Sequence, residues 1–305
     1  APNLEEYKLA CEELSNQIFL DAEKHNLTLP KPTSISIDPI VPPNNAEKMI
    51  PAYTESILKL AQANKNLVAL DADLVLDTGL IPFKEKFPER FVECGIAEQD
   101  MVSQAGTMAL SGLIPIVHSF ACFLISRASE QIYNNASQHG KVIYVGSLAG
   151  VLPGGPGHSH QAVRDIAGML SMPGMTILEP LNAMQVNLSL KWSIEKNNES
   201  TYLRLTSIPY EQSESLKSIN SLTDGQGHVI TEGSDISIIV FGPVFSYLAS
   251  EASDILGSKN ISVKVIATPW VNKIDLEWLE NVKFLKIDLY YHQKLLCLIF
   301  VVYQI

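Results

Sequence analysis

The chain has 305 residues with a formal net charge of −11, and 46% of its residues are hydrophobic while 18% are charged. The length suggests two domains, and the composition supports packed cores and argues against disorder. The negative charge argues against nucleic acid or an anionic membrane surface as a partner.

The first 45 residues are expected to form one helix and a linker. Apolar residues recur at helical spacing over residues 4–24, which predicts an amphipathic helix. Residues 27–45 contain five prolines and show no periodicity, so they predict an extended linker.

From Pro51 onward, short apolar runs alternate with helical patterns. A helix at residues 52–63 is followed by further helices and by strands expected at residues 67–70, 91–93, 114–117, 142–145, 175–178 and 202–205. This alternation predicts a parallel sheet with helices on both faces. Ligands of such sheets gather at the carboxyl ends of the strands, where Asp73, Glu98 and a loop with two histidines are expected.

A second, smaller α/β domain is predicted beyond a polar, serine-rich linker at residues 212–227. Strands expected at residues 236–241 and 261–266 flank a helix near residues 247–256. The sequence beyond Asp288 is an apolar tail without glycine, and a truncation or frameshift near Asp288 is the preferred interpretation. An unusual C-terminal strand is the alternative.

The cysteines show no metal-ligand spacing. They are Cys11, Cys94, Cys122 and Cys297. Their wide separation indicates thiols in a reducing compartment, so a cytoplasmic protein is expected. The most apolar run, residues 295–302, is too short to span a bilayer.

Three short motifs follow one another in the first predicted sheet. Glu98 stands at the turn into a helix, within Gly-Ile-Ala-Glu-Gln. Phe120 and Phe123 are three residues apart, a spacing that places two side chains on one helical face. A glycine-rich loop then ends in His158 and His160, within Gly-His-Ser-His-Gln. Each motif also has an ordinary structural interpretation, as a helix cap, a core face and a solvated loop.

The order and spacing of these motifs resemble the pyrimidine-binding domain of the transketolase family, which uses thiamine diphosphate. The resemblance covers residues 46–211 well and continues more weakly to about residue 281. It implies the thiamine-diphosphate-binding fold, with residues 1–45 ending a missing diphosphate-binding domain. It also implies that residues 228–305 form an incomplete C-terminal domain.

The resemblance implies a role for each cofactor-binding candidate. Thiamine chemistry needs a protonated aminopyrimidine N1′, and Glu98 matches the carboxylate that the family holds against this atom. Phe120 and Phe123 match the wall on which the pyrimidine stacks. Asp73 and Leu74 match an Asp-Leu pair close to the cofactor, although Asp73 could equally cap a helix.

Substrate contacts are implied for three further residues. His160 matches a histidine that binds substrate hydroxyls and moves protons, which suits imidazole because it titrates near neutral pH. His118 is either a second contact or a satisfied core histidine. Arg204 matches an arginine that anchors a sugar phosphate, and its alternative role is an ordinary ion pair.

Two departures from the family pattern limit the resemblance. The acidic pair before the active-site histidine is replaced by Gly155 and Pro156, which puts the ordinary pentose-phosphate substrate in doubt. The chain also lacks the Gly-Asp-Gly motif with which the family holds magnesium diphosphate. We therefore expect the Mg²⁺ and diphosphate ligands to lie on a partner domain or subunit.

The leading hypothesis is that the chain supplies the pyrimidine half of a transketolase-like enzyme, which transfers a two-carbon ketol unit between ketose and aldose sugars or sugar phosphates. A homodimer or a heterotetramer with the diphosphate-binding half is expected. A 1-deoxyxylulose-phosphate synthase, the β subunit of a 2-oxo acid dehydrogenase and a catalytically silent partner-binding fragment are the alternatives.

Overall fold

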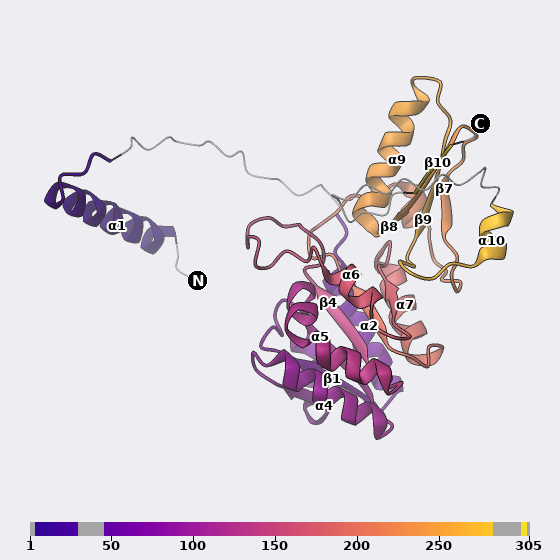
Figure 1. The fold of residues 1–305 in the computed structure, drawn as a ribbon, viewed down its shortest axis with the longest axis horizontal. Helices are drawn as coiled ribbons and strands as arrows, with labels where there is room; N and C mark the ends of the chain where they lie inside the picture. The colour runs from indigo at the N-terminus through magenta and orange to yellow at the C-terminus, as the bar shows by residue number, and fades with distance from the viewer. Residues whose placement is uncertain (1–3, 30–45, 283–299, 304–305) are drawn as a thin grey trace. The chain divides into compact units, whose positions relative to one another are not determined.

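The computed structural model describes residues 4–29, 46–282 and 300–303, and the chain divides into two compact units, Ala1–Val41 and Pro42–Ile305 (Figure 1). The first unit contains α1 (Leu4–Lys24), whose bounds match the predicted helix. Its large apolar side chains, including Leu14 and Phe19, are exposed. The predicted linker at residues 30–45 lies outside the described residues.

A six-stranded parallel sheet forms the centre of the second unit. Its strands are β1 (Leu67–Asp71), β2 (Phe91–Glu93), β3 (Ile114–Phe120), β4 (Ile143–Ser147), β5 (Thr176–Leu178) and β6 (Thr201–Arg204). They are arranged in the order β2-β1-β3-β4-β6-β5, and every neighbouring pair is parallel. The predicted α/β class, with a parallel sheet, is confirmed.

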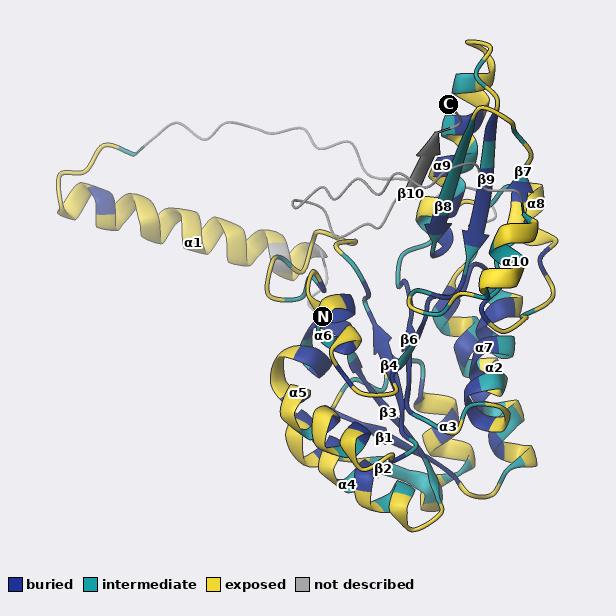
Figure 2. Cartoon of the chain, turned by 45° about the vertical axis from the view of Figure 1, so that its right-hand side comes forward, coloured by how far each residue is buried: buried dark blue, intermediate teal, exposed yellow. Residues whose placement is uncertain are grey.

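Helices cover both faces of this sheet, as predicted. They are α2 (Met49–Ala63), α3 (Ile81–Lys86), the 3₁₀ turn η1 (Pro88–Arg90), α4 (Glu98–Leu110), α5 (Ala121–Ser137), α6 (Asp165–Leu170) and α7 (Ala183–Glu195). Figure 2 shows buried strands between helices whose outward faces are exposed. Two separate clusters of apolar side chains, one on each face, hold these layers together.

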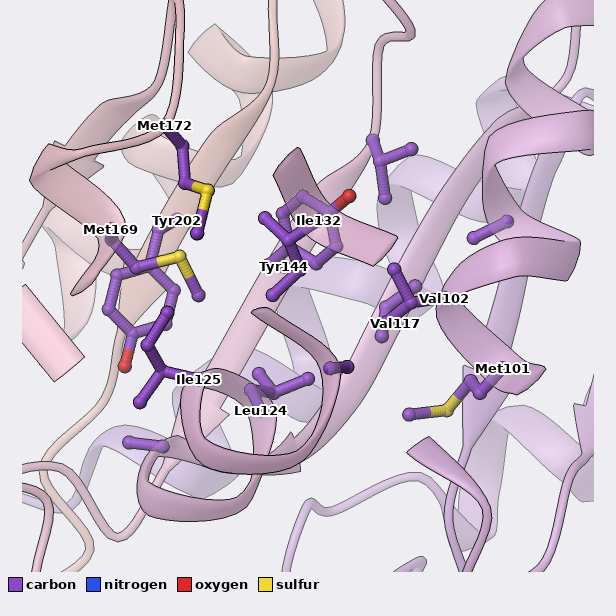
Figure 3. Close-up of a cluster of buried hydrophobic side chains, with 14 of the residues drawn as sticks. Met101, Val102, Val117, Leu124, Ile125, Ile132, Tyr144, Met169, Met172 and Tyr202 are labelled. Atoms are coloured by element: carbon purple, nitrogen blue, oxygen red, sulfur yellow. The ribbon is translucent and has the colours of Figure 1, made fainter. Parts of the chain in front are cut away.

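Successive side chains of a strand point to opposite faces of the sheet, and this alternation divides the core between the two faces. On β4, Tyr144 belongs to the cluster under α4, α5 and α6, whereas Ile143 and Val145 belong to the cluster under α2 and α7. Figure 3 shows the first cluster, in which Met101 and Val102 of α4, Leu124 of α5 and Met169 of α6 meet residues from the strands. Burial on both faces explains why the strands read as continuous apolar runs.

A smaller sheet follows, and it contains the two strands and the helix predicted beyond residue 227; its mixture of parallel and antiparallel pairs was not predicted. Its elements are α8 (Glu214–Lys217), β7 (His228–Thr231), β8 (Ile236–Phe241), α9 (Pro243–Gly257), β9 (Val263–Thr268), α10 (Leu276–Asn281) and β10 (Phe300–Tyr303). The order is β10-β8-β9-β7, with β8 and β9 parallel and both outer strands antiparallel to their neighbours. The predicted change near Asp288 lies outside the described residues.

The segment after β9 joins the two sheets. Val271 N–H donates to the Ile177 carbonyl at 3.0 Å, and Glu179 N–H donates to the Pro269 carbonyl at 2.8 Å. Trp270 meets Trp192 of α7 edge to face, with 4.9 Å between ring centroids. Backbone pairing and aromatic packing therefore link the second sheet to the edge strand β5 of the first.

Some predicted element boundaries were wrong. Strand β3 runs three residues beyond Val117, so Phe120 ends a strand and stands immediately before α5 instead of lying on a helix with Phe123. Strand β9 begins two residues later than predicted, and α2 begins three residues earlier. Strand β7 and the short helices α3, α6, α8 and α10 were not predicted. In the described ranges, every helix is too short or too polar to cross a membrane.

Candidate functional site

Most of the predicted site residues end a strand of the parallel sheet or follow one, so they belong to the carboxyl ends of the strands. Asp73 follows β1, Glu98 follows β2, Phe120 ends β3, His160 lies in the loop after β4, and Arg204 ends β6. Parallel strands bring these carboxyl ends together along a single edge of the sheet, which is where such folds bind ligands.

The helical periodicity of α4 accounts for the burial of Glu98. Glu98, Met101, Val102 and Ala105 lie at positions i, i+3, i+4 and i+7, and this stripe packs toward the sheet. As the first residue of the stripe, Glu98 is only 3% exposed. A carboxylate that serves only to complement a helix N-terminus would not need this burial.

Glu93 fixes the turn that delivers Glu98. Its Oε1 accepts the N–H of Asp73 at 2.9 Å and the N–H of Gly95 at 3.1 Å. Gly95 has a φ of +66°, a conformation that glycine adopts at low cost. One carboxylate therefore joins the loop after β1, which carries Asp73, to the turn before α4, which leads to Glu98.

Three aromatic rings from the segments after β3 and β4 meet one another. The centroids of Phe120 and Phe123 are 5.6 Å apart, and the imidazole of His160 meets both edge to face at 5.9 and 5.1 Å. All three side chains are partly exposed. The structure thus brings together the two predicted aromatic residues and the predicted histidine, which are about 40 residues apart in sequence.

Arg127 connects Glu98 to this aromatic cluster. Its Nη1 donates to Glu98 Oε1 at 2.5 Å, and its guanidinium carbon lies 3.8 Å from the centroid of Phe123. The Arg127 side chain is 39% exposed, whereas the carboxylate that it contacts is buried. Glu98, Arg127, Phe123, Phe120 and His160 therefore form one continuous cluster.

The glycine-rich loop positions His160 by short-range hydrogen bonds. His160 N–H donates to the Gly157 carbonyl at 3.1 Å, and the Ser159 hydroxyl lies 2.9 Å from His160 Nδ1. Ala162 N–H donates to the Gly150 carbonyl at 2.8 Å, which closes the loop at its base. His158, predicted to be a solvated loop residue, is exposed.

Arg204 is buried between two carboxylates. Its Nε donates to Asp165 Oδ2 and its Nη1 donates to Glu179 Oε2, each at 2.6 Å. Burial disfavours the charged guanidinium, but Glu179 and Asp165 outweigh this and hold the pKa of Arg204 above its ordinary value. The Tyr202 hydroxyl also donates to Asp165, at 2.9 Å.

This network also reaches the histidine loop. A Cβ on Gly150 would lie 3.5 Å from Nη2 of Arg204, the nitrogen that does not donate to Asp165 or Glu179. The predicted phosphate-anchor role of Arg204 stays a prediction. The geometry adds that any anion would have to share this guanidinium with two buried carboxylates.

His118 has both ring nitrogens engaged inside the protein. Nδ1 lies 3.0 Å from the Leu70 carbonyl and Nε2 lies 2.6 Å from the Tyr53 hydroxyl. A carbonyl only accepts, so Nδ1 carries the proton and the Tyr53 hydroxyl donates to Nε2. Burial lowers the pKa of His118 to about 4. The imidazole is fully buried and neutral, as a satisfied core histidine would be.

The loop after β1 has its own buried carboxylate. Asp71 accepts the N–H of Leu74 at 2.6 Å and the Thr78 hydroxyl at 2.8 Å, and burial raises its pKa to about 6. These bonds shape the turn in which Asp73, exposed at a φ of +61°, precedes the half-buried Leu74. The predicted cofactor contacts of Asp73 and Leu74 remain predictions.

The residues present fit a planar, cationic heteroaromatic ring such as a protonated aminopyrimidine. Glu98 offers a buried acceptor, and Phe123 offers an aromatic face that Arg127 joins to this carboxylate. The hydroxyl groups of Ser119 and Ser147, also at this edge, are buried without a hydrogen-bond partner in the described part of the chain. Within that part, no three His, Cys, Asp or Glu side chains are grouped to hold a metal ion.

Sequence reasoning missed Arg127, Glu93, Asp165 and Glu179. Arg127 follows Phe123 by four residues on a helix, a spacing that places both on one face and could have flagged it. Glu93 stands next to the Gly-Ile-Ala-Glu motif without a distinguishing pattern. Asp165 and Glu179 are 39 and 25 residues from Arg204 in sequence, and only the fold brings them together.

A family model described as transketolase, pyrimidine binding domain, matches residues 47–212. A putative transketolase C-terminal section from Methanocaldococcus jannaschii is 32% identical over 236 residues, which are 76% of this chain and 73% of that protein. A 1-deoxy-D-xylulose-5-phosphate synthase from Clostridium botulinum (strain Alaska E43 / Type E3) is 30% identical over 257 residues. That match covers 80% of this chain but only 40% of the synthase.

A solved structure described as a split gene transketolase, inactive beta4 tetramer, has the same fold. It superposes with a TM-score of 0.69 at 31% identity, and the match covers 78% of this chain and 76% of that one. The family model spans more than half of the chain, which confirms the family resemblance inferred from the sequence motifs. This chain belongs to the family of the transketolase pyrimidine-binding domain.

Proposed function

We propose that this chain supplies the pyrimidine half of a thiamine-diphosphate site, in an enzyme that transfers a two-carbon ketol unit between a ketose and an aldose. The observation that carries the proposal is the buried carboxylate of Glu98, which is joined through Arg127 to the ring of Phe123, with His160 against the same ring. When bound, the cofactor supplies a carbon centre that accepts and releases the ketol unit.

In this proposal, each residue of the cluster has a separate task. Glu98 accepts a hydrogen bond from the protonated N1′ of the pyrimidine and so holds a proton at that atom. Phe120 and Phe123 orient the ring, and their partly exposed faces exclude water when it is bound. His160, beside Phe123, contacts substrate hydroxyls and carries a proton to or from them. Glu93 positions the turn that presents Glu98.

The diphosphate and its Mg²⁺ are proposed to be held by another domain or subunit. No Gly-Asp-Gly motif occurs in this sequence, and hard oxygen ligands are what such a group requires. The relative whose description names a C-terminal section, and the solved split gene transketolase, support a divided enzyme. We propose an assembly of two or more copies with a diphosphate-binding half.

A 1-deoxyxylulose-phosphate synthase activity is the second candidate. It is favoured by the similarity to the clostridial synthase over 80% of this chain. The two reactions differ in the donor, because the synthase removes carbon dioxide from a 2-oxo acid whereas a transketolase cleaves a ketose. The motif Phe-Ala-Cys-Phe and the Ser-His-Gln run favour the ketose donor.

Reconstitution tests this proposal. The chain is mixed with a polypeptide carrying the Gly-Asp-Gly motif, then supplied with thiamine diphosphate, Mg²⁺, an aldose acceptor and either a ketose or pyruvate. Ketol transfer from the ketose, with no carbon dioxide released from pyruvate, is expected. Turnover only with pyruvate would favour the synthase, and micromolar binding of thiamine diphosphate to the isolated chain would refute the divided site.

A further inference from the structure

Arg127 makes two contacts that matter for the cofactor. Its guanidinium donates to Glu98 Oε1 at 2.5 Å, and the same group lies over the face of Phe123, 3.8 Å from the ring centroid. The Arg127 side chain as a whole is 39% exposed. Arg127 therefore bridges the two side chains that are proposed to receive the pyrimidine.

A guanidinium resembles a protonated aminopyrimidine in the properties that this subsite recognises. Both are planar and carry a delocalised positive charge, both donate N–H groups in the plane, and both stack on aromatic rings. A carboxylate as buried as Glu98 needs a cationic partner, because an uncompensated charge in such a position is costly. A pyrimidine that bonds to Glu98 Oε1 and stacks on the same face of Phe123 would therefore compete with Arg127.

We propose that Arg127 occupies the pyrimidine subsite in the cofactor-free chain and must withdraw before the pyrimidine can bind. The proposal rests on the proposed function of Glu98 and Phe123. Arg127 then acts as a placeholder, which keeps the Glu98 charge compensated in the free chain and lowers the affinity of the half-site for its cofactor.

The structure gives Arg127 a route out of the subsite. Its exposed side faces solvent, where a guanidinium is well hydrated at little cost. Ala128, the next residue, has φ −118° and ψ 20°, so the backbone of α5 leaves helical geometry beside Arg127. The side chain can therefore leave Glu98 without crossing the packed core on the other face of the helix.

The cost of withdrawal appears in the cofactor affinity. When only a fraction of the molecules is competent to bind, the apparent dissociation constant rises by the inverse of that fraction. A guanidinium that is withdrawn about one tenth of the time weakens binding about tenfold. Removing Arg127 should remove this penalty.

The experiment measures the Kd of thiamine diphosphate by calorimetry in the reconstituted complex with Mg²⁺. Arg127→Met is expected to bind about tenfold more tightly than the wild type, because methionine keeps the apolar stem but cannot pair with Glu98. Arg127→Lys keeps the charge but loses the planar fork, and an intermediate Kd is expected. Arg164→Met, which removes an exposed arginine bonded to Ser126, is the matched control and should leave the Kd unchanged.

A second readout tests the pair without any cofactor. In a double-mutant cycle on the isolated chain, Arg127→Met should lower the urea midpoint in the wild-type background but much less in a Glu98→Gln background. Additive effects of the two substitutions would overturn the proposal. This measurement also shows whether Arg127→Met folds.

The outcomes distinguish a failure of the placeholder role of Arg127 from a failure of the proposed function. If the wild-type complex binds thiamine diphosphate and Arg127→Met binds it equally or more weakly, the placeholder role is refuted while the proposed function stands. An equal gain in affinity for Arg164→Met would refute it too, because general charge would then explain the effect. If neither complex binds the cofactor, the proposed function fails and the inference fails with it.

Discussion

Replacement of Arg204 by methionine tests whether this residue is mainly structural. Arg204 is 8% exposed, and its guanidinium donates to two carboxylates at 2.6 Å, which are themselves buried. Methionine fills a similar volume but leaves Asp165 and Glu179 facing each other without a cation. The buried Tyr202 hydroxyl can still donate to Asp165, but it brings no charge.

The expected loss of unfolding free energy in Arg204→Met follows from the burial of Arg204 and its two carboxylate partners. Removing one partner of a buried ion pair costs about 3–5 kcal/mol, because the remaining charge is left uncompensated. That is a large part of the 5–15 kcal/mol by which a typical domain is stable. Burial raises the pKa of Glu179 even with Arg204 present, so this carboxyl takes up a proton readily once the cation is gone.

Urea unfolding at pH 7.5 and at pH 4.5 measures the effect. We expect the loss of unfolding free energy to be about 3–5 kcal/mol at pH 7.5 and smaller at pH 4.5, where Glu179, whose pKa is raised by burial, becomes protonated in the variant. The matched control is Lys217→Met. Lys217 pairs with Glu214 at 2.7 Å on the surface, and its loss should cost less than about 1 kcal/mol.

One result would refute this reasoning. If Arg204→Met loses less than about 1 kcal/mol at pH 7.5, the two carboxylates do not depend on this cation for their burial. A phosphate anchor that is free to bind substrate would behave in that way. Its replacement would instead raise the KM for phosphorylated substrates far more than for unphosphorylated ones.

Two further predictions concern buried groups near the same edge of the sheet. With its pKa lowered to about 4, His118 contributes stability that is present above pH 6.5 and is lost as the pH falls toward 4. In His118→Gln, the decrease in unfolding free energy between pH 7.5 and pH 4 should be smaller than in the wild type by up to about 3 kcal/mol, as measured by urea unfolding over this range. An equal decrease in both proteins would show that His118 does not stay neutral. Gly146→Ala should cost about 1–3 kcal/mol, because the new Cβ would lie 2.5 Å from the Tyr202 hydroxyl oxygen. Gly154→Ala, with nothing within 4 Å of its new Cβ, is the control, and equal melting temperatures for the two variants would contradict this packing.

The sequence was sufficient to predict the layers of the fold. Strand runs such as residues 67–70 are apolar throughout because both faces are covered, and this pattern needs no tertiary information. The end of β3 could not be placed in this way. His118 and Ser119 are polar residues buried on a strand, and in sequence they look like the start of a loop.

The site was predictable where the residues lie in short motifs. Glu98, Phe123 and His160 each stand in such a motif, and the fold brings Phe123 and His160 into contact. The ionic partners were not predictable, because Arg127 and Arg204 meet their carboxylates across 29 and 25–39 residues of sequence. The sequence alone also left His118 undecided, since its Tyr53 partner lies on a different element, 65 residues away.

The most direct test of the proposed role of Glu98 measures the exchange of the proton on the thiazolium C2 of thiamine diphosphate. The cofactor is bound to a reconstituted complex that contains Glu98→Gln. Glutamine keeps the size and a hydrogen bond but cannot hold the N1′ proton as a carboxylate does. We predict that exchange slows about a thousandfold, equivalent to roughly 4 kcal/mol at the barrier, while the melting temperature changes little because Arg127 can turn to solvent. Near-normal exchange together with a lowered melting temperature would show that Glu98 serves only the fold, and would contradict the proposed function.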